Sequence, residues 1–519
     1  MSDAIATTSS EIYLDANATT PILPAAQAAM IRVLSDNFGN PGSPHGAGIR
    51  ARIELDRART AVAAVLQLPA NSLIFTSGAT EGIQTAVLSV LHPQRGAASL
   101  RVLYGATEHK AVPEALAHWG EILGLTLELL PIPVDQHGRH DLPWLAENAK
   151  DATLVCTMAA NNETGAISDL AGIARVLDAL PVRPLWLVDG VQALGKLAVD
   201  WLGLRIDYAP FSGHKLHAPK GIGLLYVRAG APFTRLLAGG GQEGNARCGT
   251  ENLPGIAALG AVCEAILAGQ WQADALALAH QRLKTALLHA FPSLVMNSPS
   301  QHCLPTTINF SLLGIPSKCV LDLFDSLGLR LSAGSACNSK NAKPSFVLMA
   351  MGLGEARASS AIRLSISPNV CAADIDAAIE RIALAGQILQ THLDDMLQLE
   401  QVALPDENLE LSSRYAVTAE QLPAWQAVYP KGVLVDIREH WEQIATGAYP
   451  VGMMIEHHSL SQLPRWLGCL ALDRPLLLAC RSGRRSGQLL SLMRAKGYTQ
   501  IWHLADGLAG LPMPSAVEQ

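Results

Sequence analysis

Phe211-Ser212-Gly213-His214-Lys215 places a lysine in a short, glycine-containing connection between two apolar segments. Residues 204–209 before it and residues 223–227 after it have the apolar character of short buried strands. A lysine at such a place is useful when burial keeps part of its amine neutral and nucleophilic, as a Schiff-base lysine requires. An exposed loop lysine, like Lys220 nearby, explains the pentapeptide equally simply. The neighbouring segments must therefore decide.

The composition is that of a globular protein with large cores. The chain has 519 residues, of which 49% are hydrophobic and 16% are charged, so we expect about three domains, or a two-lobed enzyme with one added module. A net charge of -7 argues against nucleic-acid binding. Residues 1–11 have no basic or apolar targeting pattern, and no apolar run is long enough to span a membrane. We expect a cytoplasmic protein that binds neither nucleic acid nor a membrane.

The nine cysteines are odd in number, widely spaced and lack the C-x-x-C pattern. This distribution disfavours a disulfide framework and a zinc site. We expect reduced thiols and no metal ion, and we expect most of the thiols to be buried as small hydrophobic groups.

Short apolar segments alternate with helical segments from residue 73 onward, which predicts an α/β fold with a mainly parallel sheet covered by helices. Strands are predicted at 73–75, 100–104, 153–158 and 185–189, in addition to 204–209 and 223–227. Ligands of such sheets gather beyond the carboxyl ends of the strands. The polar residues of the chain stand at those ends.

Those polar residues are diverse. Residues 76–82, 107–109, 161–165 and 189–192 follow successive strands, as Lys215 does. The hydroxyls and glycines of 76–82 let backbone N–H groups approach a phosphate, although a capping turn with Ser77 or Thr80 as the cap explains them as well. Taken singly, a histidine or an aspartate here is more often structural. Together, an amine, an acid, an amide and a phosphate turn match the needs of pyridoxal phosphate.

With these motifs, residues 11 to 400 resemble the fold-type I pyridoxal-phosphate enzymes, and within them the cysteine desulfurases of the class-V aminotransferase family. The resemblance implies that Lys215 binds the cofactor and moves protons, and that Asp189 keeps the pyridine nitrogen protonated. It implies further roles for the following residues: Gln192 at the ring hydroxyl, His109 stacked on the ring and assisting proton transfer, Thr80, Ser212 and His214 at the phosphate, Ala79 and Asn162 at the cofactor, and Thr250 reaching the partner subunit's phosphate in a homodimer. Gly190 departs from the family, where alanine is usual, and we expect it to weaken one packing contact.

The chain after about residue 301 resembles the smaller mixed lobe of that family, with strands at 306–311 and 329–332 and a helix at 317–327. Residues 333–345 then place Cys337 among glycine, serines and lysines, which favours an exposed thiolate. By resemblance this segment is the catalytic loop of the desulfurases, and its length is that of the group whose cysteine reaches an acceptor.

Arg363 interrupts an apolar strand predicted at 361–366, before a long helix from 372 to about 399. A guanidinium there suits bidentate capture of a substrate carboxylate, and a structural ion pair is an equally fair interpretation from the residues. The resemblance implies that Arg363 and Asn162 hold the amino-acid carboxylate.

Residues 401–413 read as a linker, after which α/β alternation restarts. Strands are predicted at 433–436, 452–455, 476–479 and 501–504, with helices at 419–428, at 460–467 and from 486. Cys480 follows the most hydrophobic strand and opens Cys480-Arg481-Ser482-Gly483-Arg484-Arg485-Ser486, where backbone N–H groups and three arginines suit an anionic sulfur. A buried structural cysteine is the poorer interpretation, because three arginines could not share its burial.

This second unit resembles the rhodaneses, whose first signature is matched by residues 436–439. The loop is one residue shorter than in rhodanese-like phosphatases, which favours sulfur transfer. Residues 446–448 lack the usual histidine after glycine, and Leu511 stands where a tryptophan is common.

The predicted organisation is therefore a desulfurase over residues 1–400, a linker over 401–413 and a rhodanese-like domain over 414–519. The desulfurase has a large lobe at about 15–260 and a small lobe at about 1–14 and 261–400. We expect L-cysteine to become L-alanine, with the sulfur carried by Cys337, then by Cys480, and then by an acceptor protein or small thiol. Alternatives are a selenocysteine lyase, another pyridoxal-phosphate lyase or aminotransferase, and a non-catalytic sulfur-carrier scaffold.

Overall fold

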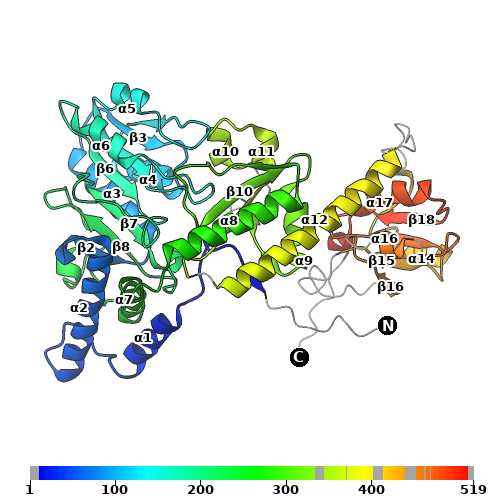
Figure 1. Cartoon of the computed structure of the whole chain (residues 1–519), viewed down its shortest axis with the longest axis horizontal. Coiled ribbons are helices and arrows are strands. Elements are labelled where there is room, and N and C mark those ends of the chain that lie inside the picture. Colours follow the sequence, from blue (N-terminus) through cyan, green and yellow to red (C-terminus); the bar gives the residue numbers. More distant parts are fainter. Residues whose placement is uncertain are drawn as a thin grey trace. The chain divides into compact units, whose positions relative to one another are not determined.

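The computed structural model describes residues 11–333, 344–369, 371–400, 413–438, 452–460, 463–467 and 469–511. The chain divides into two compact units, residues 1–386 and residues 387–519, which Figure 1 colours from blue to yellow and from yellow to red. The dividing point lies within the long helix α12 (Ala372–Glu400). None of the described helices is both long and apolar enough to cross a bilayer.

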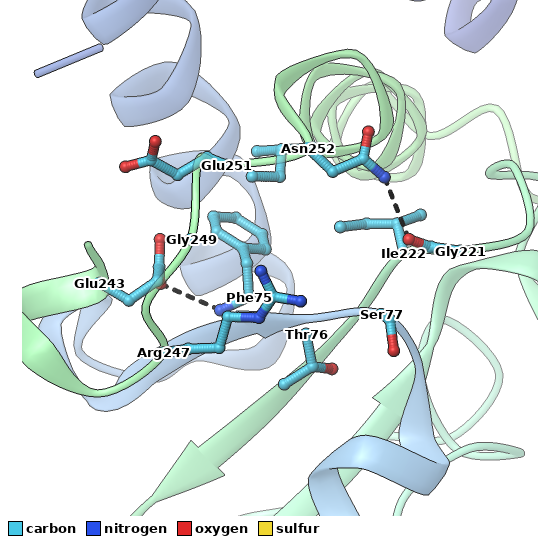
Figure 2. A pocket seen from close by; sticks show the side chains of 11 residues that line it. Phe75, Thr76, Ser77, Gly221, Ile222, Glu243, Arg247, Gly249, Glu251 and Asn252 are labelled. Carbon is cyan, nitrogen blue, oxygen red and sulfur yellow. Dashed lines mark hydrogen bonds between the residues drawn. The ribbon is translucent and has the colours of Figure 1, made fainter. Parts of the chain in front are cut away.

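A seven-stranded sheet forms the centre of the first unit, with the strand order β2-β8-β7-β6-β5-β3-β4. Its strands are β2 (Leu73–Thr76), β3 (Leu100–Gly105), β4 (Leu127–Ile132), β5 (Ala152–Met158), β6 (Leu185–Asp189), β7 (Tyr208–Ser212) and β8 (Gly223–Val227). Only β8 runs against its neighbours. At the outer edge of β2, the backbone N–H of Phe75 donates to Glu243 Oε2 at 3.0 Å (Figure 2), so a side chain satisfies the strand there.

Helices cover both faces of this sheet (Figure 1). They are α1 (Pro24–Ser35), α2 (Gly46–Leu66), α3 (Ala79–Leu91), α4 (Ala111–Leu123), α5 (Leu142–Asn148), α6 (Leu170–Asp178) and α7 (Leu253–Leu267), with short 3-10 turns η1 (Ala70–Ser72), η2 (His92–Gln94), η3 (Gly213–Lys215) and η4 (Glu243–Asn245). Along β6, Trp186 and Val188 join the core beneath α2, α6 and α7, whereas Leu187 joins the core beneath α3 and α4. Burial on both faces explains why the strands are continuously apolar.

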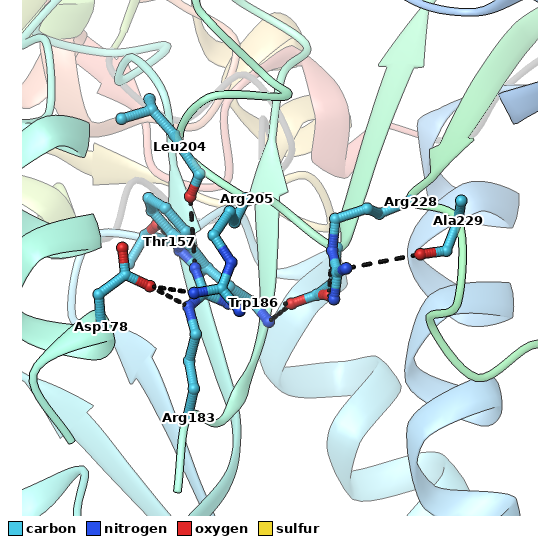
Figure 3. Close-up of polar contacts among 9 residues, drawn as sticks. Thr157, Asp178, Arg183, Trp186, Leu204, Arg205, Arg228 and Ala229 are labelled. Atoms are coloured by element: carbon cyan, nitrogen blue, oxygen red, sulfur yellow. Dashed lines mark hydrogen bonds and ion pairs between the residues drawn. The ribbon is translucent and has the colours of Figure 1, made fainter. Parts of the chain in front are cut away.

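The strand predicted at 204–209 is wrong in position, because β7 begins only at Tyr208. Arg205 has a left-handed backbone (φ 55°), which ends an extended conformation. Fully buried Asp207 then fixes the start of β7: its Oδ2 accepts from the Trp186 N–H at 2.8 Å and its Oδ1 accepts from Arg228 Nε at 2.8 Å. Arg183 Nη1 lies 3.4 Å from the same Oδ2, and Figure 3 shows the side chains of Arg183, Trp186 and Arg228. Phe211 and Ser212 therefore belong to the strand, and only η3 separates it from the chain beyond Lys215.

The rest of the first unit is built on a four-stranded sheet, with the order β12-β13-β10-β9. Its strands are β9 (Leu294–Met296), β10 (Thr307–Leu312), β12 (Ser332–Ala333) and β13 (Ala361–Ser365), and β1 (Ile12–Tyr13) pairs separately with β11 (Leu329–Arg330). The helices here are α8 (Ala273–Ala290), α9 (Ser317–Ser326), α10 (Phe346–Ala350), α11 (Glu355–Ser359) and α12. The strand predicted at 329–332 is thus two strands with different partners.

The second unit contains a five-stranded, fully parallel sheet, with the order β14-β18-β17-β15-β16. Its elements are β14 (Ala416–Val417), α14 (Leu422–Val428), β15 (Val433–Asp436), β16 (Met454–His457), α16 (Leu463–Trp466), β17 (Leu476–Ala479), α17 (Arg484–Ala495), β18 (Ile501–Leu504) and the turn η6 (Leu508–Gly510). Leu476 and Leu478 face one core and Leu477 faces the other, so this sheet also is buried on both faces.

Candidate active site

Lys215 ends the turn η3, directly after β7, at the carboxyl edge of the seven-stranded sheet. Its Nζ donates to the backbone carbonyl oxygens of Asn17 and Ala18, each at 2.7 Å. The segment after β1 therefore provides two acceptors for the lysine ammonium.

Asp189 ends the neighbouring strand β6 and is only 6% exposed. Its Oδ1 accepts from the Val191 N–H at 2.9 Å. Burial raises the pKa of the Asp189 carboxyl, while the nearby His109 and Lys215 act in the opposite direction. Desolvation, and then Lys215, lower the pKa of His109. The structure thus brings Lys215, Asp189 and His109 into one electrostatic cluster, as the sequence predicted, with a carboxylate that a cation would stabilise.

Gln192 lies in the turn after β6 and is buried. Its Oε1 accepts from Lys196 Nζ at 2.7 Å. Its Nε2 is buried and has no partner among the described residues. A buried N–H group without an acceptor is costly unless a ligand supplies one.

The turn between β2 and α3 is not an ordinary capping turn. Gly78 is the N-cap of α3 and no side chain caps the helix, while Ser77 and Thr80 are exposed. The interpretation of Ser77 or Thr80 as a cap is therefore wrong, and the hydroxyls remain available at the helix N-terminus together with Ala79. The Ser77 N–H donates to Glu81 Oε2 at 2.8 Å.

The end of β7 adjoins this turn. Ser212 pairs with Gly223, and a methyl group on Gly223 would lie 2.6 Å from the Cα of Gly78. His214 Nδ1 lies 3.2 Å from Thr19 Oγ1, and burial, with Lys215 and Lys220, lowers the pKa of His214 to about 4. Ser212 and His214, which are predicted to bind the phosphate, thus lie at the end of β7 and in the turn after it. This strand end is close to the turn that carries Thr80, the third residue predicted there.

A pocket opens on the outer side of the same turn (Figure 2). Its lining includes Thr76 and Ser77 at the turn, and Arg247, Gly249, Glu251 and Asn252 from the segment before α7. Arg247 Nε contacts Glu81 Oε1 at 3.1 Å. The pocket does not include Lys215, Asp189 or Gln192, so we do not regard it as the cofactor site. Thr250 is exposed on this segment, and its contact with a partner subunit stays a prediction.

Arg363 lies in β13 and is 2% exposed. Its Nη2 pairs with Asp15 Oδ1 at 2.6 Å, and its Nη1 donates to the backbone oxygen of Asn162 at 3.2 Å. Its buried Nε has no partner in the described part of the chain. The structural ion pair foreseen as the alternative is thus present, next to the main chain of Asn162, and capture of a substrate carboxylate stays a prediction.

Comparison with known proteins identifies the family to which the chain belongs. The profile of the family "Aminotransferase class-V" matches residues 12–378. The chain belongs to this family. A cysteine desulfurase of Cereibacter sphaeroides is 38% identical over 374 residues, 71% of this chain and 94% of the relative. The cysteine desulfurase NifS of Azotobacter vinelandii is 35% identical over 375 residues, 72% of this chain and 92% of the relative. Within the family, the chain is thus a member of the cysteine desulfurase group.

Solved structures agree with this family assignment. The structure titled NifS-like protein superposes with a TM-score of 0.66 at 31% identity, covering 73% of this chain and all of that chain (100%). The structure titled SspA in complex with cysteine superposes with a TM-score of 0.61 at 28% identity, covering 69% of this chain and 99% of that chain. The predicted fold-type I architecture is confirmed.

Class-V aminotransferases of this group use pyridoxal phosphate, and the residues around Lys215 fit it. Buried Asp189 offers an acid for the pyridine nitrogen, Gln192 Nε2 offers an unused donor for the ring oxygen, and the uncapped N-terminus of α3 offers N–H groups for the phosphate. The predicted cofactor is therefore confirmed for the family to which the chain belongs.

Phe211 explains the departure at Gly190. A methyl group on Gly190 would lie 2.3 Å from Phe211 Cε1, far inside contact distance. The aromatic ring therefore occupies the space that an alanine side chain would need, and Gly190 makes room for Phe211 of β7. The weakened packing contact against the cofactor stays a prediction.

Cys337 lies outside the described residues, as do its neighbours 334–343. The flanks of that segment are described. Ser332 Oγ donates to Asp15 Oδ1 at 2.8 Å, and Ser345 Oγ donates to Glu163 Oε2 at 2.6 Å. One flank therefore shares the Asp15 carboxylate with Arg363, and the other flank is bonded to Glu163, the residue after Asn162.

Cys480 directly follows β17 in the second unit and is 0% exposed. Its Sγ lies 3.6 Å from Ser486 Oγ, which donates to the backbone oxygen of Gly483 at 2.9 Å. Arg481 is exposed. The argument that neighbouring arginines exclude a buried cysteine is therefore wrong, because the loop turns Arg481 outward while the thiol stays inside.

Three residues of the site were missed in the sequence. Asn17 supplies a carbonyl to Lys215, and its Nδ2 donates to the backbone oxygen of Asn162 at 3.1 Å. Asp15 pairs with Arg363, and Lys196 with Gln192. The sequence predicts only a strand and a polar turn at Asp15 and Asn17, and no local pattern distinguishes these two residues.

Proposed function

We propose that this protein is a pyridoxal-phosphate-dependent cysteine desulfurase, which converts L-cysteine to L-alanine and relays the sulfur from Cys337 to Cys480 of a rhodanese-like unit. The observation that carries the proposal is the cluster of Lys215, Asp189 and His109 at the carboxyl edge of the sheet in a chain of the cysteine desulfurase group. The acceptor that finally takes the sulfur is a protein or a small thiol.

The residues of the site have separate tasks. When bound, pyridoxal phosphate withdraws electrons from the α-carbon of the amino acid. The amine of Lys215 removes the proton at that carbon, and the carbonyl oxygens of Asn17 and Ala18 hold the resulting ammonium. The lowered pKa of His109 keeps its ring neutral near pH 7, so the ring can accept a proton.

Sulfur leaves the substrate by thiol chemistry. The Cys337 thiolate attacks the substrate sulfur, the carbon–sulfur bond breaks, its electron pair stays with the carbon, and protonation of that carbon completes alanine. The products are alanine and a persulfide on Cys337. The resemblance of residues 334–343 to the desulfurase loop supports this step, together with the flanks held at Asp15 and Glu163.

The second transfer conserves the oxidation state. The Cys480 thiolate attacks the outer sulfur of the Cys337 persulfide, the sulfur–sulfur bond breaks, and the Cys337 thiolate is released. A tether places the two thiols at an effective concentration of about 1 mM when its span suits them. Since Cys480 is buried, its sulfur must become accessible for this step. The five-stranded parallel sheet with Cys480 at a strand end supports a rhodanese-like assignment.

Persulfide mapping tests the proposal. The full-length protein, loaded with cofactor, is treated with cysteine that carries labelled sulfur, and persulfides are located by mass spectrometry. We expect label on Cys337 and Cys480 in the native protein, on Cys337 alone in Cys480→Ala, and on neither in Cys337→Ala. Cys319→Ala, which changes an exposed thiol, is the matched control and should label as the native protein does.

Two outcomes would overturn parts of the proposal. Label on Cys337 with none on Cys480 in the native protein removes the relay and leaves the desulfurase. Undiminished turnover of cysteine by Cys337→Ala removes the desulfurase and favours an aminotransferase or another lyase.

A further inference from the structure

Lys196 lies four residues after Gln192, in the turn segment that follows β6. The backbone N–H of Lys196 donates to the carbonyl oxygen of Ala193 at 2.9 Å, and the N–H of Leu194 donates to the carbonyl oxygen of Gly190 at 3.2 Å. Gly195 has a left-handed backbone (φ 67°), so the segment is a turn and not a continuous helix. Within this turn, Lys196 Nζ donates to Gln192 Oε1 at 2.7 Å.

In its charged form the Lys196 amine has only donors, so that form can bond the amide of Gln192 through the oxygen alone. The Gln192 nitrogen must then point the other way, and it is buried without a partner among the described residues. A free glutamine amide can rotate to present either atom. The bond from Lys196 to Gln192 Oε1 fixes the amide in one of these two orientations.

We propose that Lys196 is a positioning residue that locks the Gln192 amide with its N–H group toward the phenolic oxygen of pyridoxal phosphate. The proposal rests on the cofactor assignment and is independent of which amino acid the enzyme consumes. A donor at that oxygen stabilises its anionic form. It therefore lowers the pH at which the proton shared between this oxygen and the nitrogen of Lys215 is lost.

The surroundings of Lys196 support a role beyond packing. Desolvation, followed by the charges of Lys215 and Arg363, lowers the pKa of Lys196 to about 7, and Lys196 in turn acts on His217. These three groups are all cationic or neutral. Asp189 is the carboxylate of this cluster, and it interacts with Lys215 and His109. An anionic oxygen of the cofactor would add a further counter-charge, whereas a lysine with a purely structural role would be better replaced by an apolar residue.

The test is an absorbance titration of the full-length protein loaded with cofactor, without any amino-acid substrate. The pH midpoint of the visible band of the cofactor bound to Lys215 is measured for the native protein, Lys196→Met, Lys196→Arg, Gln192→Leu and the double variant Lys196→Met/Gln192→Leu. We expect Lys196→Met to raise the midpoint by about one pH unit, a tenfold change in the proton affinity. Lys196→Arg keeps a donor and should stay close to the native value.

The double variant separates two modes of action. If Lys196 acts through the amide, Lys196→Met adds much less to Gln192→Leu than it does to the native protein. An equal shift in both backgrounds, or no shift in Lys196→Met, overturns the proposal. Should Lys196→Met fail to fold, Gln192→Glu serves instead, because it keeps the bond to Lys196 and offers the cofactor an acceptor: a midpoint no higher than the native value overturns the proposal. Since no cysteine is present, failure of the desulfurase assignment cannot imitate either result.

Discussion

The seven-stranded and the five-stranded sheet both bury polar side-chain atoms at their carboxyl edges, but they differ in how these atoms are paired. At the edge of the seven-stranded sheet, buried polar atoms such as Gln192 Nε2 have no partner in the described chain. At the edge of the five-stranded sheet, Asp436 and Arg438 are both 3% exposed and bind each other, with Arg438 Nη2 2.7 Å from Asp436 Oδ2.

The difference in the pairing of buried polar groups indicates how each edge is stabilised. Unused buried donors are costly in an empty protein, and they indicate a site completed by a ligand from outside. A carboxylate and a guanidinium that pair with each other indicate an edge whose polar groups stabilise one another within the protein. The first edge depends on its ligand, and the second depends on its own ion pair.

The largest expected effect is on the second edge. Arg438→Met should lower the free energy of unfolding of the second unit by about 3–5 kcal/mol, because it removes the guanidinium that pairs with the buried Asp436 carboxylate. Calorimetry of the full chain measures this loss.

Arg474→Met is the matched control. Its ion pair with Glu456 is partly exposed, with side chains 32% and 29% accessible, so the loss should stay below about 1 kcal/mol. Equal losses in the two variants would show that the buried pair has no special part in the second edge.

The next effect concerns the first unit and its response to acid. Burial lowers the pKa of His140 to about 4, so between about pH 6.5 and pH 4 the unfolded chain takes up a proton that the folded chain does not. The contribution of neutral His140 to the free energy of unfolding is therefore fully present above about pH 6.5. It is lost as the pH drops through this window, by up to about 3 kcal/mol.

His140→Gln removes this group, and its melting temperature should fall less steeply than the native value on acidification to pH 4. His118→Gln, at an exposed position, is the control and should follow the native curve. If His140→Gln follows it as well, the acid response of the first unit comes from other groups.

The smallest effect tests the packing beneath the first edge. Gly190→Ala should destabilise the first unit by about 1–3 kcal/mol, since the methyl group would meet Phe211 Cε1 at 2.3 Å. Combination with Phe211→Leu should restore part of the loss in a thermal melt. A single variant as stable as the native protein would mean that the ring has room to move.

The sequence predicted the interior strands well. The bounds of β6, β8, β15, β17 and β18 match residue for residue, because each is a continuous apolar run between polar or glycine residues. The edge strand β4 was missed: its side chains are mostly half-buried and it contains Pro131, so its pattern is weak. β7 was placed too early because Ile206 is apolar and buried without being extended.

The site was predicted where a side chain has a distinctive chemistry. Lys215, Asp189 and His109 influence one another's charges, Gln192 is buried in the turn after β6, and the roles of these residues stay predictions. Asn17 acts on Lys215 through a backbone carbonyl, which no sequence pattern encodes, and Lys196 is an ordinary lysine in a turn until its contact with Gln192 is seen. Such roles depend on tertiary distances alone.

The segment around Asn17 also fixes the order in which the site can be assembled during synthesis. β1 pairs with β11, the Asn17 N–H donates to Ser365 Oγ at 3.0 Å, and Arg363 holds Asp15. The partners of Asp15 and of the Asn17 N–H, Arg363 and Ser365, thus follow them by 348 residues in the chain. Contacts so distant in sequence form late. The contacts with Arg363 and Ser365 that hold the carbonyl groups facing Lys215 are therefore among the last that the nascent chain can form.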